Sequence, residues 1–259
     1  MEISDDRQDS IKPMLPTYEK YKRILLLGEA DFSFTRAFAK TCNGENNGSV
    51  KNDASTEITA TEYGDGPDIA NRYYDGNQNI LSTSMNSLQN LDPVKQILSG
   101  FNARRLGDKD CTCQRWNTAK QEWAPPSKFW ELSPKFDLII FNFPHSDQAG
   151  RAAKLIKALF RQIRICISDG RLEPTIVIEM RLRHIEVDPK LKKNIRAEYK
   201  HEEASLEFEF EMIECWESDL DRWEKLGYQH KWTRRNASIR DVGMGCKVWR
   251  WTSKISKCS

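Results

Sequence analysis

Several features that would classify a chain quickly are missing from this sequence. Its 259 residues contain no apolar run near the roughly 20 residues that a membrane-spanning helix needs. Lysine and arginine (40) almost balance aspartate and glutamate (38), so the formal net charge is only +2 and does not by itself indicate a nucleic-acid partner. No internal repeat is visible. The sequence therefore predicts a soluble globular protein and excludes membrane channels and repeat arrays.

Metal-binding and dinucleotide motifs are also scarce. The seven cysteines are odd in number and scattered, and no signal peptide precedes them, which favours reduced thiols in the cytosol or nucleus. Cys111 and Cys113 form a C-x-C without a second pair or a nearby histidine, so we predict no metal site. A G-x-G-x-x-G pattern is missing, which argues against an NAD-linked oxidoreductase.

The stretch Arg23–Phe34, R-I-L-L-L-G-E-A-D-F-S-F, is the part around which we expect the chain to be organised. Ile24–Leu27 is a short apolar run, typical of a strand buried on both faces of a parallel sheet. Gly28 allows a sharp turn, and Asp31 or Ser33 can cap the helix that follows. Such a turn leaves amide hydrogens that can hold a nucleotide-like ligand. An ordinary strand–turn–helix without a ligand is the alternative.

The remaining elements continue the α/β pattern. We predict strands at Glu57–Tyr63, Phe136–Phe141, Thr175–Leu182, Tyr228–Thr233 and Gly245–Thr252, with a weaker candidate at Phe101–Leu106. We predict helices at Asp68–Tyr74, Ile80–Leu98 (broken by Pro93), Leu155–Ile167 and Trp216–Leu226. The expected fold class is α/β, a Rossmann-like, doubly wound sheet that is mostly parallel with an antiparallel C-terminal strand.

The domain organisation is predicted to be simple. Residues 1–20 are polar and contain two prolines, which predicts a flexible N-terminal arm. No linker is visible after residue 20, so residues 21–259 should form a single domain, with a charged insertion at about 184–215. In Leu206–Met212 apolar residues alternate with glutamates, which predicts a half-exposed strand. A helix is the alternative, because glutamate is a poor strand former.

Two polar residues follow predicted strand ends. Glu62 stands where an acid can accept hydrogen bonds from both hydroxyls of a ribose; a solvated loop carboxylate is the alternative. Asn142 opens the tetrapeptide N-F-P-H. Its amide can bind the edge of a planar base, Pro144 keeps the turn rigid, and His145 can stack on the base or accept a proton near neutral pH. A histidine that caps the next helix is the alternative.

Basic and aromatic residues suggest two surfaces for RNA. One helical face carries Arg151, Lys154, Lys157, Arg161 and Arg164. The basic tail Lys225–Lys257 is interleaved with Tyr228, Trp232, Trp249 and Trp251. Charge with interleaved aromatic rings suits phosphate contact and base stacking. The alternative is a solvated helix face and a tail that neutralises the acidic segment Glu202–Glu224.

The segment Gly107–Ser133 is predicted to be irregular. Its three tryptophans are Trp116, Trp123 and Trp130. If exposed they could stack on bases. Packing beneath a long loop is the more frequent fate, and we favour that interpretation.

Two motifs taken together resemble those of a known family. L-L-L-G-E-A-D-F-S-F at Leu25–Phe34 and F-D-L-I-I-F-N-F-P-H at Phe136–His145 resemble the Rossmann-like domain of ribosomal-RNA uridine N(3)-methyltransferases. Members typically show G-E-G-[DN]-F-S-F, an A-T strand, and F-D-x-I-I-F-N-F-P-H; here A-T-E-Y occupies Ala60–Tyr63. The resemblance extends from about Lys22 to Arg183. It implies a class I methyltransferase fold that uses S-adenosyl-L-methionine and acts on a uracil in large-subunit rRNA.

The resemblance also implies roles for individual residues. Those assigned to the cofactor are Gly28, Glu29, Ala30, Asp31, Phe32, Ser33, Glu62, Asn102 and Phe143. Glu62 would bind the ribose, and Asn102 would lie near the adenine. Those assigned to the target base and the transfer are Asn142, Pro144 and His145. Uracil N3 must lose a proton, for which His145 is the predicted acceptor and water the alternative. The implied partner is ribosomal RNA or a pre-ribosomal particle, in the nucleolus, nucleus or cytoplasm.

The chain departs from the family pattern at several points. Ala30 replaces the second glycine and adds a methyl group where the cofactor comes closest. Asp147 stands where a small residue is usual, and the family's P-Y-x-x-W segment after the fifth strand is missing. A catalytically silent relative that serves as an RNA- or protein-binding module is therefore the alternative function. The sequence does not predict the oligomeric state.

Overall fold

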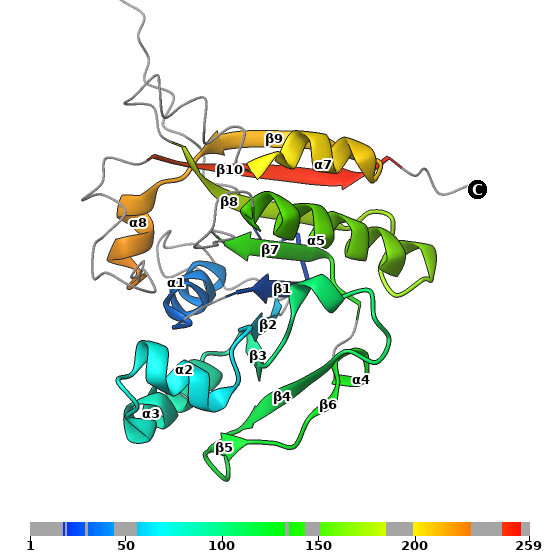
Figure 1. Cartoon of the computed structure of the whole chain (residues 1–259). Helices are drawn as coiled ribbons and strands as arrows, with labels where there is room; N and C mark the ends of the chain where they lie inside the picture. The colour runs from blue at the N-terminus through cyan, green and yellow to red at the C-terminus, as the bar shows by residue number, and fades with distance from the viewer. Residues whose placement is uncertain are drawn as a thin grey trace, which may run out of the picture.

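The computed structural model describes residues 18, 20–28, 31–43, 56–132, 135–142, 151–184, 199–228 and 245–254. Its strands are β1 (Arg23–Leu27), β2 (Glu57–Thr61), β3 (Val94–Ser99), β4 (Thr112–Asn117), β5 (Glu122–Trp123), β6 (Ser127–Lys128), β7 (Leu138–Asn142), β8 (Val177–His184), β9 (Phe210–Glu217) and β10 (Gly245–Ser253). Its helices are α1 (Ser33–Cys42), α2 (Gly66–Tyr73), α3 (Gln78–Gln89), the 3₁₀ helix η1 (Ala103–Arg105), α4 (Phe129–Leu132), α5 (Arg151–Ser168), α7 (His201–Glu207) and α8 (Leu220–Lys225). Figure 1 shows their arrangement.

All these strands belong to one sheet, in the order β5-β4-β3-β2-β1-β7-β8-β10-β9, with β6 beside β4. The central strands β3, β2, β1, β7 and β8 are parallel. β10 runs antiparallel to β8 and to β9. The fold is therefore the predicted class I methyltransferase-like α/β sheet with an antiparallel C-terminal strand. The start of β1 is tied to β7, because the Asp137 carboxylate accepts hydrogen bonds from the backbone N–H groups of Lys22 and Arg23 (3.0 and 2.9 Å).

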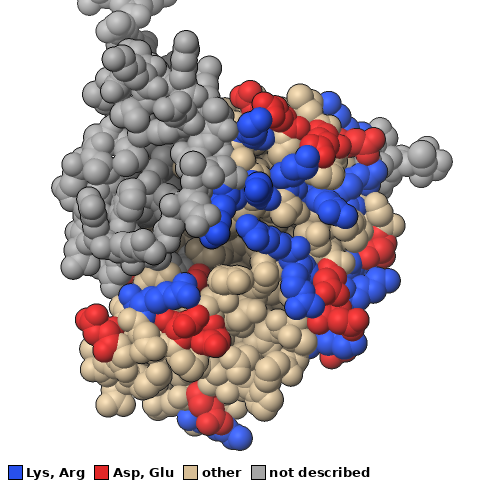
Figure 2. Space-filling view, in the orientation of Figure 1, with Lys and Arg blue, Asp and Glu red and all other residues tan. Residues whose placement is uncertain are grey.

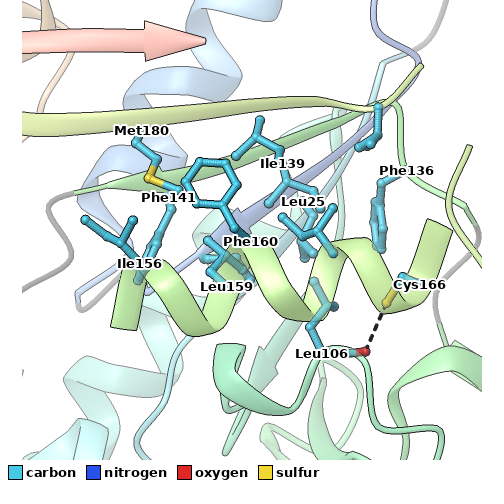
Figure 3. Close-up of a cluster of buried hydrophobic side chains, with 14 of the residues drawn as sticks. Leu25, Leu106, Phe136, Ile139, Phe141, Ile156, Leu159, Phe160, Cys166 and Met180 are labelled. Atoms are coloured by element: carbon cyan, nitrogen blue, oxygen red, sulfur yellow. Dashed lines mark hydrogen bonds between the residues drawn. The ribbon is translucent and has the colours of Figure 1, made fainter. Parts of the chain in front are cut away.

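Two apolar layers cover the sheet, because alternate strand residues point to opposite faces. On the face that we call the α5 face, strand residues such as Leu25 and Ile139 pack against Leu159 and Phe160 of α5 (Figure 3). On the opposite α1 face, α1, α2, α3 and α8 cover strand residues such as Leu26. A strand that is buried on both faces appears in the sequence as an uninterrupted run of apolar residues, and this is why β1 and β7 could be predicted.

The sequence prediction is wrong for the third strand. The prediction is helix over Ile80–Leu98 with a break at Pro93, but α3 ends at Gln89 and the part after the proline, Val94–Ser99, forms β3. The weaker candidate strand Phe101–Leu106 contains η1 instead. Pro93 ends the helical pattern, and pairing with β2 supplies the backbone hydrogen bonds of β3. The helical spacing of the leucines before Pro93 gave no indication that the chain changes from a helix to a strand after it.

Four further segments can also be compared with the prediction. The segment predicted to be irregular contains β4, β5, β6 and α4. Leu206 lies in α7 and Met212 in β9, so the two interpretations of this segment each hold for one half of it. Trp216 belongs to β9, and α8 begins at Leu220. Of the predicted strand Tyr228–Thr233 only Tyr228 is described, and it lies outside any strand.

The start of the chain contributes to the core. Tyr18 falls within the predicted flexible arm, but its side chain is buried and contacts Phe38. For Tyr18 the arm prediction is wrong, because its hydroxyl has a partner on β8 that the local sequence does not reveal. The single domain from residue 21 onward stays a prediction. No helix in the described part of the chain combines the length and apolar character of a membrane span.

Candidate active site

Three neighbouring parallel strands end beside one another at the residues that the sequence singled out. In the β1–β7 pair Leu27 lies opposite Phe141, so Gly28 and Asn142 occupy the next register position. In the β1–β2 pair the same continuation places Gly28 level with Glu62. Figure 1 shows the arrows of β1 and β7 pointing to the same edge. Ligands of open α/β sheets bind beyond this carboxyl edge, so these three residues border one candidate site.

Gly28 is the residue at the centre of this edge. Its φ of +69° is a left-handed conformation that favours glycine, and a Cβ built there would lie 3.1 Å from Cε2 of Phe141. The residue is exposed. A ligand can therefore approach the backbone closely at the point where β1 ends.

Asp31 and Phe32 shape the turn into α1. The N-cap residue of α1 is Phe32, which makes no side-chain cap, but Oδ1 of the preceding Asp31 accepts a hydrogen bond from the backbone N–H of Ser33 (3.0 Å), the first residue of the helix. The Tyr74 hydroxyl donates to the backbone carbonyl of Asp31 (3.1 Å). Phe32 has φ +59° and a buried ring, although it is not glycine. The surrounding contacts fix a turn conformation that the residue would not otherwise favour.

Glu62 is held between β2 and β3. Its backbone N–H donates to Leu98 O (2.9 Å), and its carbonyl accepts from the N–H of Phe101 (3.0 Å). The residue is only 6% exposed, so it is not a solvated loop carboxylate. Burial raises the pKa of the nearby Tyr73 hydroxyl, and the negative charges of Glu62 and Asp31 raise it further. The carboxylates of Glu62 and Asp31 therefore lie near the neutral hydroxyl of Tyr73 at the ends of β1 and β2. The sequence analysis did not single out Tyr73.

Asn102 follows β3 and is half-buried. Its Oδ1 accepts a hydrogen bond from the backbone N–H of Arg104 (3.0 Å) and so caps η1. The amide nitrogen is the end of this side chain that can donate to a ligand. The structure thus places Asn102 one strand beyond Glu62, at the same edge of the sheet.

Asn142 is bound from the side by a charged cluster. Its Oδ1 accepts a hydrogen bond from Nη1 of Arg181 on β8 (2.9 Å), and Nη2 of Arg181 donates to the Tyr18 hydroxyl (3.0 Å). That hydroxyl donates to Glu179 (2.9 Å). Sequence reasoning missed Tyr18, Glu179 and Arg181. The available signal was the pair Glu179 and Arg181, two positions apart, among the apolar residues of the first six positions of β8.

The other predicted site residues lie outside the described part of the chain. They are Glu29, Ala30, Phe143, Pro144 and His145. Asp147 and Trp232, which the sequence analysis also singled out, fall outside it as well. Their roles stay predictions.

The family of the chain follows from a comparison with protein-family models. Residues 25–231 match the BMT5-like model, described as rRNA (uridine-N3-)-methyltransferase BTM5-like. The chain belongs to this BMT5-like family. It is therefore an S-adenosylmethionine-dependent RNA methyltransferase. None of the curated proteins matches it.

Distant structural similarities accompany the BMT5-like match. KamB, a 16S rRNA methyltransferase, is 13% identical with a TM-score of 0.44, and the match covers 90% of this chain and 87% of that one. An antibiotic-related methyltransferase is 13% identical with a TM-score of 0.45 and the same coverage. Podospora anserina PaMTH1, in its SAH-bound form, is 12% identical with a TM-score of 0.41, over 91% and 73% of the two chains. The chain is assigned to its family by the match to the family model, and these structural similarities carry no part of that assignment.

The residues at the strand ends of this BMT5-like chain fit the cofactor of the family. Gly28 is exposed, so a ligand can reach its backbone, and a Cβ at this position would meet the Phe141 ring. Glu62 offers a buried carboxylate two residues beyond Ala60, the register partner of Leu26. An acid at the end of the second strand suits the two hydroxyls of a ribose.

The basic face of α5 divides into two parts. Lys157 pairs with Glu207 and Arg164 with Glu209, each at 2.7 Å, so part of this face neutralises acids of the α7–β9 region, a role that the alternative interpretation gave to the basic tail and not to this helix. Among the described residues no ion pair involves the other three basic side chains, which are Arg151, Lys154 and Arg161. Figure 2 shows Lys and Arg gathered over α5, with acidic residues interspersed toward α7 and β9. Positive charge that no described carboxylate neutralises is therefore concentrated on these three residues, which we call the open stripe of α5.

The tryptophans are structural wherever the chain is described. Nε1 of Trp116 donates to Asn86 Oδ1 (2.9 Å), and Nε1 of Trp130 donates to Leu106 O (2.9 Å). Packing was the favoured interpretation for these residues, and it is confirmed. The proposal of base stacking in the basic tail is wrong for its described aromatic residues, because they are buried in the core; these are Tyr228, Trp249 and Trp251. Their rings pack in the two apolar layers that cover the sheet and do not form a stacking surface.

The C-x-C pair lies in the interior. Cys111 and Cys113 are both buried, and burial raises the pKa of each thiol, to about 12 for Cys113. Thiols in this state are poor metal ligands. The described residues contain no group of three His, Cys, Asp or Glu side chains that could hold a metal ion.

Proposed function

We propose that this chain methylates N3 of a uridine in large-subunit ribosomal RNA. The observation that carries the proposal is the register of β1 and β7, which sets Gly28 beside Asn142. The family description supplies the chemistry, and the geometry supplies one edge at which cofactor and base could meet. Bringing both reactants to such an edge accounts for a large part of the rate in group transfer.

The cofactor side of the site runs from the β1 turn to β3. We propose that the turn residues Gly28, Glu29, Ala30, Asp31, Phe32 and Ser33 hold the methionine end of S-adenosylmethionine. Glu62 accepts hydrogen bonds from the ribose hydroxyls, and the amide nitrogen of Asn102 donates toward the adenine. When bound, the cofactor supplies a methyl group activated by a sulfonium charge. The contribution of these side chains is to bind and orient it.

The base side follows β7. In this proposal Asn142 holds the edge of the uracil, Phe143 contacts the cofactor, and Pro144 keeps the turn rigid. The N3 proton must leave before or during transfer, and His145 accepts it, with water as the second candidate. A folded rRNA would turn the uridine out of its stack to reach this pocket.

The open stripe of α5 provides the RNA contact in this proposal. Arg151, Lys154 and Arg161 would meet phosphate groups beside the target nucleotide. Such contacts fix position but do not read sequence. Selection of the target uridine would therefore depend on the pocket and on the fold of the RNA.

Two measurements, made one after the other, test the proposal. Equilibrium titration of the full chain with S-adenosylmethionine comes first; no binding at millimolar cofactor would favour the silent relative that Ala30 suggests. The second compares modified uridines in large-subunit rRNA from cells with and without the protein. The proposal expects one N3-methyluridine to disappear. If every such site stays modified while the cofactor binds, the substrate lies elsewhere.

A further inference from the structure

A buried charged cluster adjoins Asn142 on the α1 face. Glu179 and Arg181 of β8 are 0% and 2% exposed, and Arg250 of β10 is 2% exposed. The sheet register explains their proximity: Asn142 lies opposite Arg181, and Arg250 lies opposite Glu179. All four side chains therefore project from neighbouring strands toward the same layer.

The fully buried part of the cluster contains more positive than negative charge. Glu179 pairs with Arg181 (2.8 Å) and with Arg250 (2.9 Å). Burial raises the pKa of the Tyr18 hydroxyl, and the Glu179 carboxylate raises it further, so Tyr18 is a neutral member. The second carboxylate, Glu214, contacts Arg250 (2.9 Å) from a half-exposed position. The fully buried part thus holds two guanidinium groups and one carboxylate.

Arg181 is fixed in orientation by aromatic rings. Its Cζ lies 4.5 Å from the ring centroid of Phe34 and 5.0 Å from that of Trp223. One guanidinium nitrogen contacts Asn142 and another contacts Tyr18, while Nε is buried without a hydrogen-bond partner among the described residues. The group is therefore held as a rigid donor toward the end of β7.

The contact with Arg181 determines which way the Asn142 carboxamide points. A guanidinium only donates hydrogen bonds, so the atom 2.9 Å from Nη1 must be the carboxamide oxygen. The amide nitrogen is then at the other end of the group. An adjacent cation also polarises the amide and strengthens its N–H groups as donors.

We propose that Arg181 is a positioning residue for the transfer: it directs the amide of Asn142 at the target uracil and favours the form of the base that has lost its N3 proton. This inference rests on the proposed function. Loss of that proton leaves negative charge on N3 and on the two uracil carbonyl oxygens. An amide N–H donated to one of these oxygens, backed by a buried cation, stabilises that charge.

The step balances in atoms and charge. The N3–H bond breaks and the proton passes to His145 or to water. The nitrogen lone pair forms the new N–C bond to the methyl group, while the C–S bond breaks and its electron pair stays on sulfur. Arg181 neither gains nor loses a proton, so its effect is on the acidity of the base.

The test measures methyl transfer to large-subunit rRNA transcribed in vitro, with either uridine or 5-fluorouridine incorporated throughout. The fluorinated base has a more acidic N3–H and depends less on stabilisation by the protein. Arg181→Met should slow transfer to uridine by about 100-fold, and 5-fluorouridine should restore most of the loss. The pH at which the transfer rate rises should increase by about one pH unit. Cofactor affinity should stay within about threefold of wild type.

Further variants keep the inference testable if Arg181→Met does not fold. Arg181→Lys retains the positive charge but loses the guanidinium's set of hydrogen-bond donors. Its transfer rate should lie between those of Arg181→Met and wild type. Tyr18→Phe removes one partner of the guanidinium and should slow transfer by about three- to tenfold with the same 5-fluorouridine rescue. In each soluble variant the side-chain amide NMR signal of Asn142 should move from its wild-type position.

The outcomes separate the inference from the function. Equal losses with uridine and 5-fluorouridine, together with an unchanged pH profile, would show that Arg181 is only structural. An unmoved Asn142 amide signal would overturn the positioning role. If the wild-type chain transfers no methyl group to uridine N3, the proposed function fails first and the inference fails with it.

Discussion

A Cβ at position 28 would lie 3.1 Å from Cε2 of Phe141, the residue that immediately precedes Asn142. Gly28 and Phe141 belong to the two strand ends on which the site is built, and the register of β1 and β7 brings them together. The absence of a side chain at position 28 therefore matters both for packing and for access to the backbone. The two effects can be measured separately.

We expect Gly28→Ala to weaken S-adenosylmethionine binding by about tenfold or more, because the added methyl group would press on the Phe141 ring and shift the turn that holds the cofactor. The left-handed φ should also cost about 1–2 kcal/mol in the free energy of unfolding. Gly170→Ala is the matched control, since Gly170 has φ +78° and nothing within 4 Å of its Cβ position. The control should lose similar stability and keep its cofactor affinity. Unchanged affinity in Gly28→Ala would contradict the assignment of this turn.

Glu62→Gln tests the ribose contact. The amide keeps the shape of the carboxylate but loses its charge and one acceptor, so cofactor affinity should fall by about 10- to 100-fold. A deoxy analogue of the cofactor that lacks both the 2′- and the 3′-hydroxyl should bind wild type and variant almost equally. Glu57→Gln, at the opposite end of β2, is the control and should behave like wild type. A full loss of affinity that persists with the deoxy analogue would indicate a structural effect instead.

The divided basic face of α5 gives a prediction about RNA. Replacing Arg151, Lys154 and Arg161 with glutamine should weaken RNA binding and lower the slope of log affinity against log salt by about 0.7 for each phosphate that the variant no longer binds. Lys157→Gln and Arg164→Gln should change the slope less, because Glu207 and Glu209 already neutralise these side chains. Fluorescence anisotropy at several salt concentrations measures both quantities. Equal slopes in the two sets would remove α5 from the RNA interface.

The sequence was informative where a local pattern and the final structure coincide. The apolar runs that became β1 and β7 are buried on both faces, so four consecutive apolar residues sufficed to identify them. The glycine after β1 and the asparagine after β7 were found because they directly follow those runs. Their common edge could be predicted because parallel neighbouring strands end on the same side.

The charged cluster could not be predicted in this way. Tyr18 and Glu179 are 161 positions apart, and Arg181 and Asn142 are 39 apart, so no local pattern records their contacts. In sequence, Glu179 and Arg181 resemble the exposed side of an alternating strand. Both are buried because α1 and α8 cover this face and because each charge has a partner there. Strand β3 was missed for a related reason, because it is stabilised by pairing with β2, a segment that is distant from it in the sequence.

The buried thiol of Cys166 predicts a dependence of stability on alkaline pH. Its Sγ–H donates to Leu106 O at 3.4 Å (Figure 3), and burial raises its pKa from an ordinary 9.0 to about 12. The folded pKa lies above the unfolded one, so the stabilisation is complete below pH 9 and is lost as the pH rises toward 12.

Above pH 9 the unfolded chain releases a proton that the folded chain keeps. Cys166 should therefore lower the free energy of unfolding by up to about 1.4 kcal/mol per pH unit. Cys166→Ser keeps a donor for Leu106 but does not ionise in this range, so its stability should fall less steeply by that amount. Urea titrations between pH 8 and 11 give the slopes; Cys215→Ser, at an exposed thiol whose pKa is raised less by burial, is the comparison and should change the slope less. Identical slopes in wild type and Cys166→Ser would show that this thiol ionises as readily in the folded protein as in the unfolded chain.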